Sequence, residues 1–217
     1  MKKYVTEFIG TFFLVLTVGL AGGPNPALAI GSVLMVMIYA GGHISGAHYN
    51  PAVTLAVYIR RRISASDALF YVAAQLIGAL VAGLLVSVFI ELPDKAEQST
   101  MIIKKALLGE FLGTFALAYV VLNVATVKAN EGNSYYGLAI GFTVFVMATA
   151  LGSFSGGAFN PAVAVGAIVM NIIKFGNIWI YLVGCLGGGA LAAAIFNALN
   201  PEEKRPITGP EDKIDKK

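Results

Sequence analysis

Charged side chains are scarce in this chain of 217 residues, at 12% against about 25% in an average soluble domain. Hydrophobic residues make up 57% of the chain, and its mean hydropathy is +0.77. This composition excludes an ordinary soluble domain and is typical of a polytopic helical membrane protein. The net charge of +3 is small, and we expect membrane lipid but no nucleic acid as a partner.

Cysteine and paired acidic residues are also lacking. Cys185 is the only cysteine, which excludes an intramolecular disulfide. No aspartate lies between Asp94 and Asp212, and no His-Glu-x-x-His motif occurs, so an intramembrane enzyme would lack its usual groups. His43 and His48 have no further ligands for a metal, and structural hydrogen bonding is the better interpretation of both. We therefore expect no enzyme activity, no cofactor and no metal site.

Six apolar stretches are long enough for transmembrane helices, which need roughly 20 apolar residues each. They cover about residues 4–22, 26–42, 68–90, 103–127, 137–151 and 178–199. Two further stretches, 51–59 and 161–173, are too short to span a membrane comfortably. The predicted fold is an all-α membrane protein with six transmembrane helices and two re-entrant half-helices.

One short phrase occurs twice, offset by 110 residues. Ser-Gly-Ala-His-Tyr-Asn-Pro-Ala-Val at 45–53 returns as Ser-Gly-Gly-Ala-Phe-Asn-Pro-Ala-Val at 155–163, and Glu-Phe-x-Gly-Thr-Phe occurs at 7–12 and 110–115. Each half holds three spans, so the second half enters the membrane from the opposite side. We predict one domain over residues 1–200, with inverted repeats at about 4–91 and 103–199. Such repeats place a transport site near the membrane midplane.

The repeated Asn-Pro-Ala motifs have the residue types that begin helices. Asn is a good N-cap, and Pro loses no needed hydrogen bond at the first helical position. Two half-helices that begin there would meet at the midplane, each N-terminus with roughly half a positive charge, and would oppose cations and protons. If each Asn oxygen caps its own helix, the amide group is left to donate into a pore. The motif residues are Asn50, Pro51, Ala52, Asn160, Pro161 and Ala162.

The residues before each motif would be extended backbone at membrane depth. Unsatisfied carbonyls cost several kcal/mol each there unless they are buried or wet, and a water-filled pore would use them as acceptors. The candidate pore carbonyls are those of Gly46, Ala47, His48, Gly156 and Ala158. Glu7 and Glu110 are the only acidic residues within the spans, and their symmetry favours support of the loop backbones over a proton relay.

The distribution of Lys and Arg predicts the orientation. With the N-terminus inside, 11 of these residues lie on the cytoplasmic side, and four, Lys95, Lys104, Lys105 and Lys174, lie outside. We expect an integral protein of the plasma (inner) membrane with both termini cytoplasmic, and residues 201–217 as a disordered cytoplasmic tail. The arginine run at 60–62 would anchor this topology, with contact to anionic lipid as the lesser alternative.

Together these motifs resemble the aquaporin family, the major intrinsic proteins, over about residues 4–199. The resemblance rests on the paired Glu-Phe-x-Gly-Thr, on Gly-His-Ile-Ser-Gly-Ala-His-x-Asn-Pro-Ala-Val-Thr at 42–54 and on the Ala-Gln of the third helix. It implies six helices and two half-helices per subunit, one pore per subunit and a homotetramer. It also implies passive conduction of water or small neutral solutes.

The second motif departs from the family pattern. Family members usually have Arg three residues after the second Asn, at the narrowest point, where this chain has Val163, and Ala164 stands in place of the Asp of glycerol facilitators. Carried over by spacing, the selectivity-filter positions are Ile30, Ala148, Gly157 and Val163, all apolar. A divergent water channel and a wide apolar filter for uncharged solutes or gases both remain open. An ion-coupled secondary transporter is a further alternative, although it would need coupling groups beyond the two symmetric glutamates.

Overall fold

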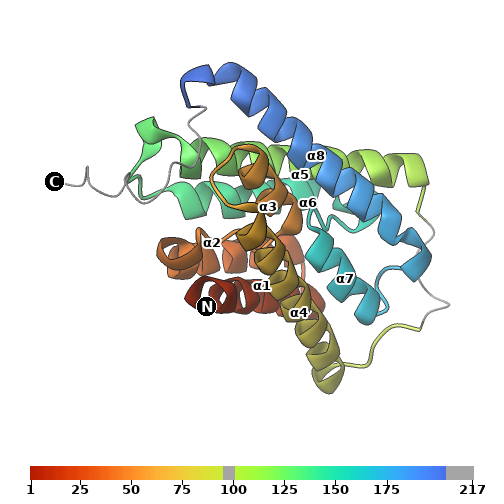
Figure 1. Cartoon of the computed structure of the whole chain (residues 1–217). Helices are drawn as coiled ribbons and strands as arrows, with labels where there is room; N and C mark the ends of the chain where they lie inside the picture. Colours follow the sequence, from red (N-terminus) through yellow and green to blue (C-terminus); the bar gives the residue numbers. More distant parts are fainter. Residues whose placement is uncertain (95–100, 204–217) are drawn as a thin grey trace.

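A computed structural model describes residues 1–94 and 101–203, and this part of the chain is helical. Its α-helices are α1 (Lys2–Leu20), α2 (Pro26–Ser45), α3 (Pro51–Ile59), α4 (Ala65–Phe89), α5 (Ile103–Thr126), α6 (Tyr136–Ser155), α7 (Pro161–Val169) and α8 (Ile178–Leu199) (Figure 1). Three short 3-10 turns follow α5, α7 and α8: η1 (Lys128–Asn130), η2 (Phe175–Asn177) and η3 (Pro201–Glu203). Among the described residues, six helices are long and apolar enough to cross a membrane, as predicted.

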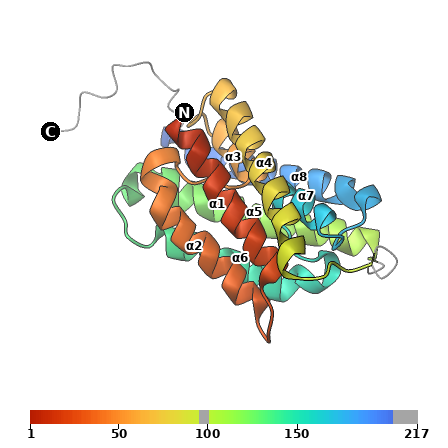
Figure 2. The ribbon, with the colours of Figure 1, turned by 90° about the horizontal axis from the view of Figure 1, so that it is seen from below.

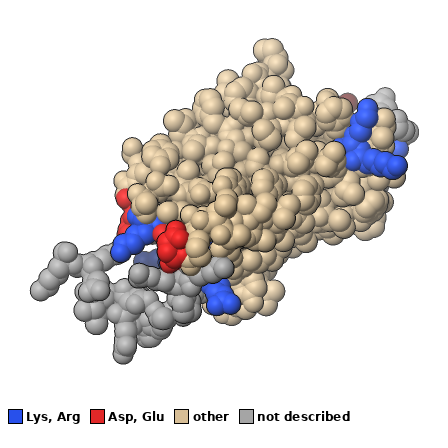
Figure 3. All heavy atoms as spheres, turned by 90° about the horizontal axis from the view of Figure 1, so that it is seen from above, with Lys and Arg blue, Asp and Glu red and all other residues tan. Residues whose placement is uncertain are grey.

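The surface has the polarity of a membrane protein. In the view of Figure 3, Lys and Arg gather at two opposite ends of the molecule, and the band between these ends shows neither basic nor acidic side chains. Large apolar side chains are exposed on the helices. Leu84 and Val88 of α4, for example, are 64% and 76% exposed. A continuous apolar surface of this kind fits the hydrocarbon of a bilayer and not water.

The long helices pack closely because small residues lie where they cross. A side chain at Gly78 of α4 would collide with the carbonyl oxygen of Phe8 in α1, and one at Gly188 of α8 with that of Phe111 in α5. The pairs α1–α4 and α5–α8 therefore repeat the same contact in the two halves. Figure 2 shows the long helices side by side, and α3 and α7 contact α4 and α8.

The two half-helices are nine residues long. Both begin at the predicted Pro, and the first ends with its apolar stretch at Ile59, whereas the second ends at Val169, four residues before the end of the apolar stretch at 161–173. It ends because Asn171 adopts a left-handed φ of 58° and the Ile172 N–H turns back to the Ala167 carbonyl at 2.8 Å, as in a Schellman motif. Arg61, with φ of 61°, makes the equivalent turn after α3. The end of α7 could not be read from the sequence, because mostly apolar residues follow Val169.

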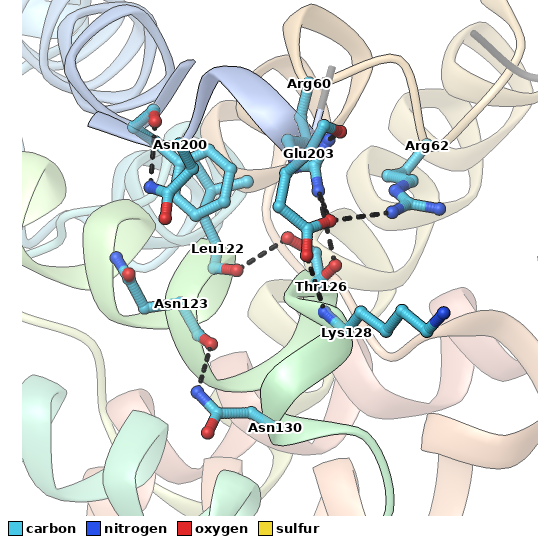
Figure 4. A network of polar contacts seen from close by, with 10 residues as sticks. Arg60, Arg62, Leu122, Asn123, Thr126, Lys128, Asn130, Asn200 and Glu203 are labelled. Carbon is cyan, nitrogen blue, oxygen red and sulfur yellow. Dashed lines mark hydrogen bonds and ion pairs between the residues drawn. The ribbon is translucent and has the colours of Figure 1, made fainter. Parts of the chain in front are cut away.

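The arginine run after α3 contacts the end of the described chain (Figure 4). Arg60 is 1% exposed, and its guanidinium donates to the Glu203 carbonyl and, at 2.8 Å, to the Glu203 carboxylate. The guanidinium carbon also lies 4.8 Å from the ring centroid of Phe196. Arg62 reaches the same carboxylate at 3.3 Å, and the Lys128 N–H donates to it at 3.0 Å. The Lys128 N–H, followed by the Arg60 guanidinium, holds the pKa of Glu203 below its ordinary value.

These contacts correct two expectations about the polar ends of the chain. Residues 201–203, predicted as part of a disordered tail, form the 3-10 turn η3. In the run at 60–62, predicted as a topology anchor, Arg60 is not available for contact with lipid, because it is buried and paired with Glu203. The rest of the predicted tail, 204–217, and Lys95 lie outside the described residues.

Candidate functional site

The N-termini of α3 and α7 meet inside the molecule, each capped by the Asn of its motif. The Asn50 side-chain oxygen accepts from the backbone N–H two residues on at 2.8 Å, and Asn160 does the same at 2.9 Å. Each Pro occupies the first helical position. Both asparagines are almost fully buried, at 2% and 3% exposure. The local cause is the one expected from Asn-Pro: a capping oxygen, followed by a residue that needs no backbone donor.

The asparagine amide groups join the two loops. The Asn50 Nδ2 donates to the Phe159 carbonyl at 2.9 Å, and the Asn160 Nδ2 donates to the Tyr49 carbonyl at 2.9 Å. The expectation that each amide is left wholly free for a pore therefore needs correction. An amide nitrogen carries two hydrogens, so one per asparagine is used by the opposite loop and one remains. The reciprocal pair fixes the two helix starts relative to each other.

Glu7 holds the first loop with both carboxyl oxygens. Its Oε1 accepts from the Ser45 hydroxyl at 2.7 Å and the His48 N–H at 3.0 Å. Its Oε2 accepts from the Tyr49 N–H at 2.7 Å and the Gln75 amide at 2.8 Å. Glu7 is fully buried. The backbone N–H groups of His48 and Tyr49 lie in the extended loop before α3, where they have no helical partner, and one side chain satisfies both.

Glu110 holds the second loop in the same geometry. Its Oε1 accepts from the Ser155 hydroxyl at 2.6 Å and the Ala158 N–H at 3.0 Å, and its Oε2 accepts from the Phe159 N–H at 2.7 Å. The fourth position differs, because the Cys185 thiol lies there at 3.4 Å in place of an amide. Among the described residues, the two glutamates therefore occupy equivalent positions in the two halves.

The glycine of each Glu-Phe-x-Gly-Thr repeat makes room for a loop aromatic. The Tyr49 ring lies where a side chain at Gly10 would lie, and the Phe159 ring lies against Gly113 in the same way. Tyr49 and Phe159 have left-handed φ values of 50° and 46°, which L-residues rarely adopt, and both are 1% exposed. Burial of the rings offsets the backbone strain and holds the carbonyls to which the asparagines donate.

Sequence reasoning missed the tyrosines that hold the start of each loop. The Tyr71 hydroxyl donates to the Ser45 carbonyl at 2.7 Å, and the Tyr181 hydroxyl donates to the Ser155 carbonyl at 2.5 Å. The signal was present, because these tyrosines occur at the same offset of 110 residues as the loops. The Gln75 side chain, which also bonds the Thr54 hydroxyl at 3.1 Å, has no such repeat and was missed for that reason.

A cavity of about 460 Å³ runs past the two motifs. Asn50 and Asn160 line it, and so do three of the four expected filter residues, Ile30, Gly157 and Val163. Ala148 is not among the described residues that line this cavity; its Cα lies 3.5 Å from where a Gly157 side chain would begin. Four expected pore-carbonyl residues line the cavity as well: Ala47, His48, Gly156 and Ala158. Most of the remaining lining is aliphatic.

A second cavity, of about 410 Å³, opens near the N-terminus and holds the fifth of these residues, Gly46. His48 and Val121 line both cavities, so these two residues lie between them. The His48 Nδ1 lies 3.1 Å from the Thr54 hydroxyl, so its ring takes part in structural hydrogen bonding. In the described part of the chain, no group of three or more His, Cys, Asp or Glu side chains could hold a metal ion.

Six membrane-spanning helices around two opposed half-helices, with a cavity passing both helix starts, define a channel-like class of membrane protein. The family model of the major intrinsic proteins matches residues 1–196. The chain is 38% identical over 219 residues to "Glycerol uptake facilitator protein-like 6" of Lactiplantibacillus plantarum, covering 94% of this chain and 100% of that one. It is 31% identical over 242 residues to "Aquaporin AqpM" of Methanothermobacter thermautotrophicus, covering 93% and 98%.

The fold is also similar to that of a solved structure. The aquaglyceroporin from Plasmodium falciparum superimposes with a TM-score of 0.76 at 20% identity, covering 93% of this chain and 98% of that one. The chain belongs to the major intrinsic protein family. Members of this family are membrane channels for water and glycerol-type small solutes, and they are not enzymes.

Proposed function

We propose that this protein is a passive channel that conducts water and other small neutral solutes through one pore in each subunit of a homotetramer. One observation carries the proposal: the N-termini of α3 and α7 face each other at a single cavity that both motif asparagines line. A solute that passes this point meets two amide donors and two helix N-termini. Each N-terminus carries roughly half a positive charge, which opposes cations and protons but not neutral molecules.

The loops would supply the hydrogen bonds that a permeating molecule loses on leaving water. The remaining amide hydrogens of Asn50 and Asn160 would donate, and the carbonyls of the cavity-lining loop residues would accept. Glu7 and Glu110 would hold these carbonyls in place rather than relay protons, because all four carboxyl oxygens already accept from loop and helix donors. Their symmetric burial supports this structural role.

The proposed filter consists of Ile30, Ala148, Gly157 and Val163. Three of these residues line the cavity, and Ala148 backs Gly157, so the filter would be wide and without a polar side chain. This lining favours a second candidate function, a channel mainly for uncharged solutes or gases rather than water. Val163→Arg combined with Ala148→His should then lower glycerol permeability severalfold, since both changes fill the pore and add charge.

The proposed orientation places both termini in the cytoplasm of the plasma (inner) membrane. The positive-inside rule supports this choice, because Lys2, Lys3 and the run at 60–62 belong to the end of the molecule that carries the N-terminus. Lys104, Lys105 and Lys174 belong to the opposite end.

Light scattering from proteoliposomes after a hyperosmotic glycerol jump tests the function. Fast shrinkage followed by slow reswelling would identify a water channel that excludes glycerol. Fast shrinkage with fast reswelling would identify a channel for larger neutral solutes. Permeability equal to that of bare lipid would contradict both, and a flux that saturates or follows an ion gradient would favour a secondary transporter.

A further inference from the structure

We propose that Lys105 and Lys174 form a cation barrier at the entrance of the pore, which takes over part of the ion exclusion that the apolar Val163 does not provide. Both lysines line the same cavity as Val163 and the two motif asparagines. They come from different elements, because Lys105 lies in the first turn of α5 and Lys174 directly precedes η2. This inference rests on the proposed channel function.

The rim around these lysines is built of apolar side chains. The Lys105 Nζ lies 5.8 Å from the ring centroid of Phe154, which lines the cavity too, and this cation–π contact holds the charge near the opening. Met101, Ile102 and Ile172, which are neighbours of the two lysines in the sequence or close to them, line the same cavity. An ammonium group beside such a low-dielectric wall acts over a longer range than one on an open polar surface.

Within residues 1–94 and 101–203, no acidic side chain pairs with either ammonium group. Among the described residues that line the cavity there is no Asp or Glu, and no described residue forms an ion pair with Lys105 or Lys174. Lys104, the neighbour of Lys105 on α5, does not line the cavity within the described part of the chain. The cavity therefore carries two formal positive charges at one end, and a cation that enters from that end must pass them before it reaches the helix N-termini.

Ionic strength separates this barrier from that of the half-helices. Exposed charges are screened beyond about 8 Å at 0.15 M salt and about 3 Å at 1 M, whereas buried dipoles are screened much less. Lys105 is exposed and Lys174 half-buried, while the asparagines at the helix starts are buried. Exclusion due to the lysines should weaken as salt is raised, and exclusion due to the half-helices should persist.

The test uses the full-length protein in planar bilayers and proteoliposomes, with potassium chloride as the probe. Lys105→Met and Lys174→Met together should raise the ratio of K⁺ to Cl⁻ permeability by about tenfold at 0.15 M, with a smaller rise for each single change. Lys105→Glu and Lys174→Glu together should raise it further, and the difference from wild type should shrink at 1 M. Lys104→Met is the matched control and should leave the ratio unchanged.

Water permeability, measured in the same vesicles, keeps the two proposals apart. Water flux equal to bare lipid in the wild type would overturn the channel function itself. Normal water flux, with K⁺ permeability in both double variants equal to that of Lys104→Met, would overturn the lysine barrier alone. An equal rise of the K⁺ to Cl⁻ permeability ratio in Lys104→Met would also overturn the lysine barrier, since general surface charge would then explain the exclusion of K⁺.

Discussion

Arg60 and Met170 occupy equivalent positions in the two halves of the molecule, directly after α3 and α7, and both are buried. The backbone turns beside them are alike, but the contacts differ. Arg60 pairs with Glu203 near the chain end, whereas the Met170 thioether packs against Gly19 of α1. One repeated backbone can therefore be anchored by a charge pair or by apolar packing, according to which part of the chain covers it.

The glutamate sites differ in a similar way. In the first half, a polar chain continues from Glu7 through Gln75 to Thr54. In the second half, Glu110 meets the Cys185 thiol, and the position equivalent to Thr54 is Ala164. The carboxyl oxygens and loop N–H groups are thus common to both sites, and only the surroundings have diverged. The loop geometry therefore does not depend on whether the fourth partner of the glutamate is an amide or a thiol.

The largest effect is expected from Glu7→Gln and Glu110→Gln. Each carboxyl oxygen accepts from a loop N–H, so whichever end the new amide nitrogen occupies, it faces a donor. Each change should lower the free energy of unfolding by at least about 2–3 kcal/mol and abolish most water permeability. Thermal unfolding in detergent and proteoliposome swelling measure both. If one variant kept wild-type stability, the equivalence of the two sites would be broken.

Glu203→Gln should have the next largest effect. It leaves the buried Arg60 guanidinium without its anionic partner, which should cost roughly 2 kcal/mol of stability. Glu202→Gln is the matched control, because Glu202 is exposed and adjacent. Thermal unfolding of the two variants checks this. Equal melting temperatures would mean that the charge pair anchors α3 no better than a neutral contact does.

The same pair predicts a pH dependence of stability. The pKa of Glu203 is lower in the folded protein than in the unfolded chain, where it is about 4.3. The ionised carboxylate therefore makes its full contribution to the free energy of unfolding above that unfolded-state pKa. This contribution is lost as the pH falls through the lower pKa of the folded state. The gap in melting temperature between wild type and Glu203→Gln should be constant from pH 7 to 5 and should narrow below about pH 4. A gap that widens in acid would reverse the expected sign.

The smallest effects should come from the residues that differ between the glutamate sites. Gln75→Met removes two donated hydrogen bonds and should cost about 1–2 kcal/mol, whereas Cys185→Ala removes one weak sulfur contact and should cost about 1 kcal/mol or less. Water permeability should remain in both variants. Loss of water flux in Cys185→Ala alone would show that the second site depends on its thiol.

Most of the fold could be predicted from the sequence, because its signals are local. Apolar length indicated the six spans, and Asn-Pro indicated both half-helix starts at the correct residues. The end of α7 was missed, because the turn at Asn171 has no glycine to mark it and apolar residues follow. The ion pair between Arg60 and Glu203 was not predicted either, since 143 residues separate the two side chains in the sequence.

Two helix starts, two supporting glutamates and an inverted repeat were determined by the sequence alone, because each depends on residue types within a few positions or on repetition along the chain. The tertiary structure decided how those parts act on each other. Each asparagine donates to the carbonyl before the other motif, over 109 and 111 residues, so one amide hydrogen of each holds the loops together. The tertiary structure also placed Lys105 and Lys174 at one opening of the cavity that Val163 lines. These two lysines are far apart in the sequence, and they line the same opening only because α5 and α7 pack around one cavity.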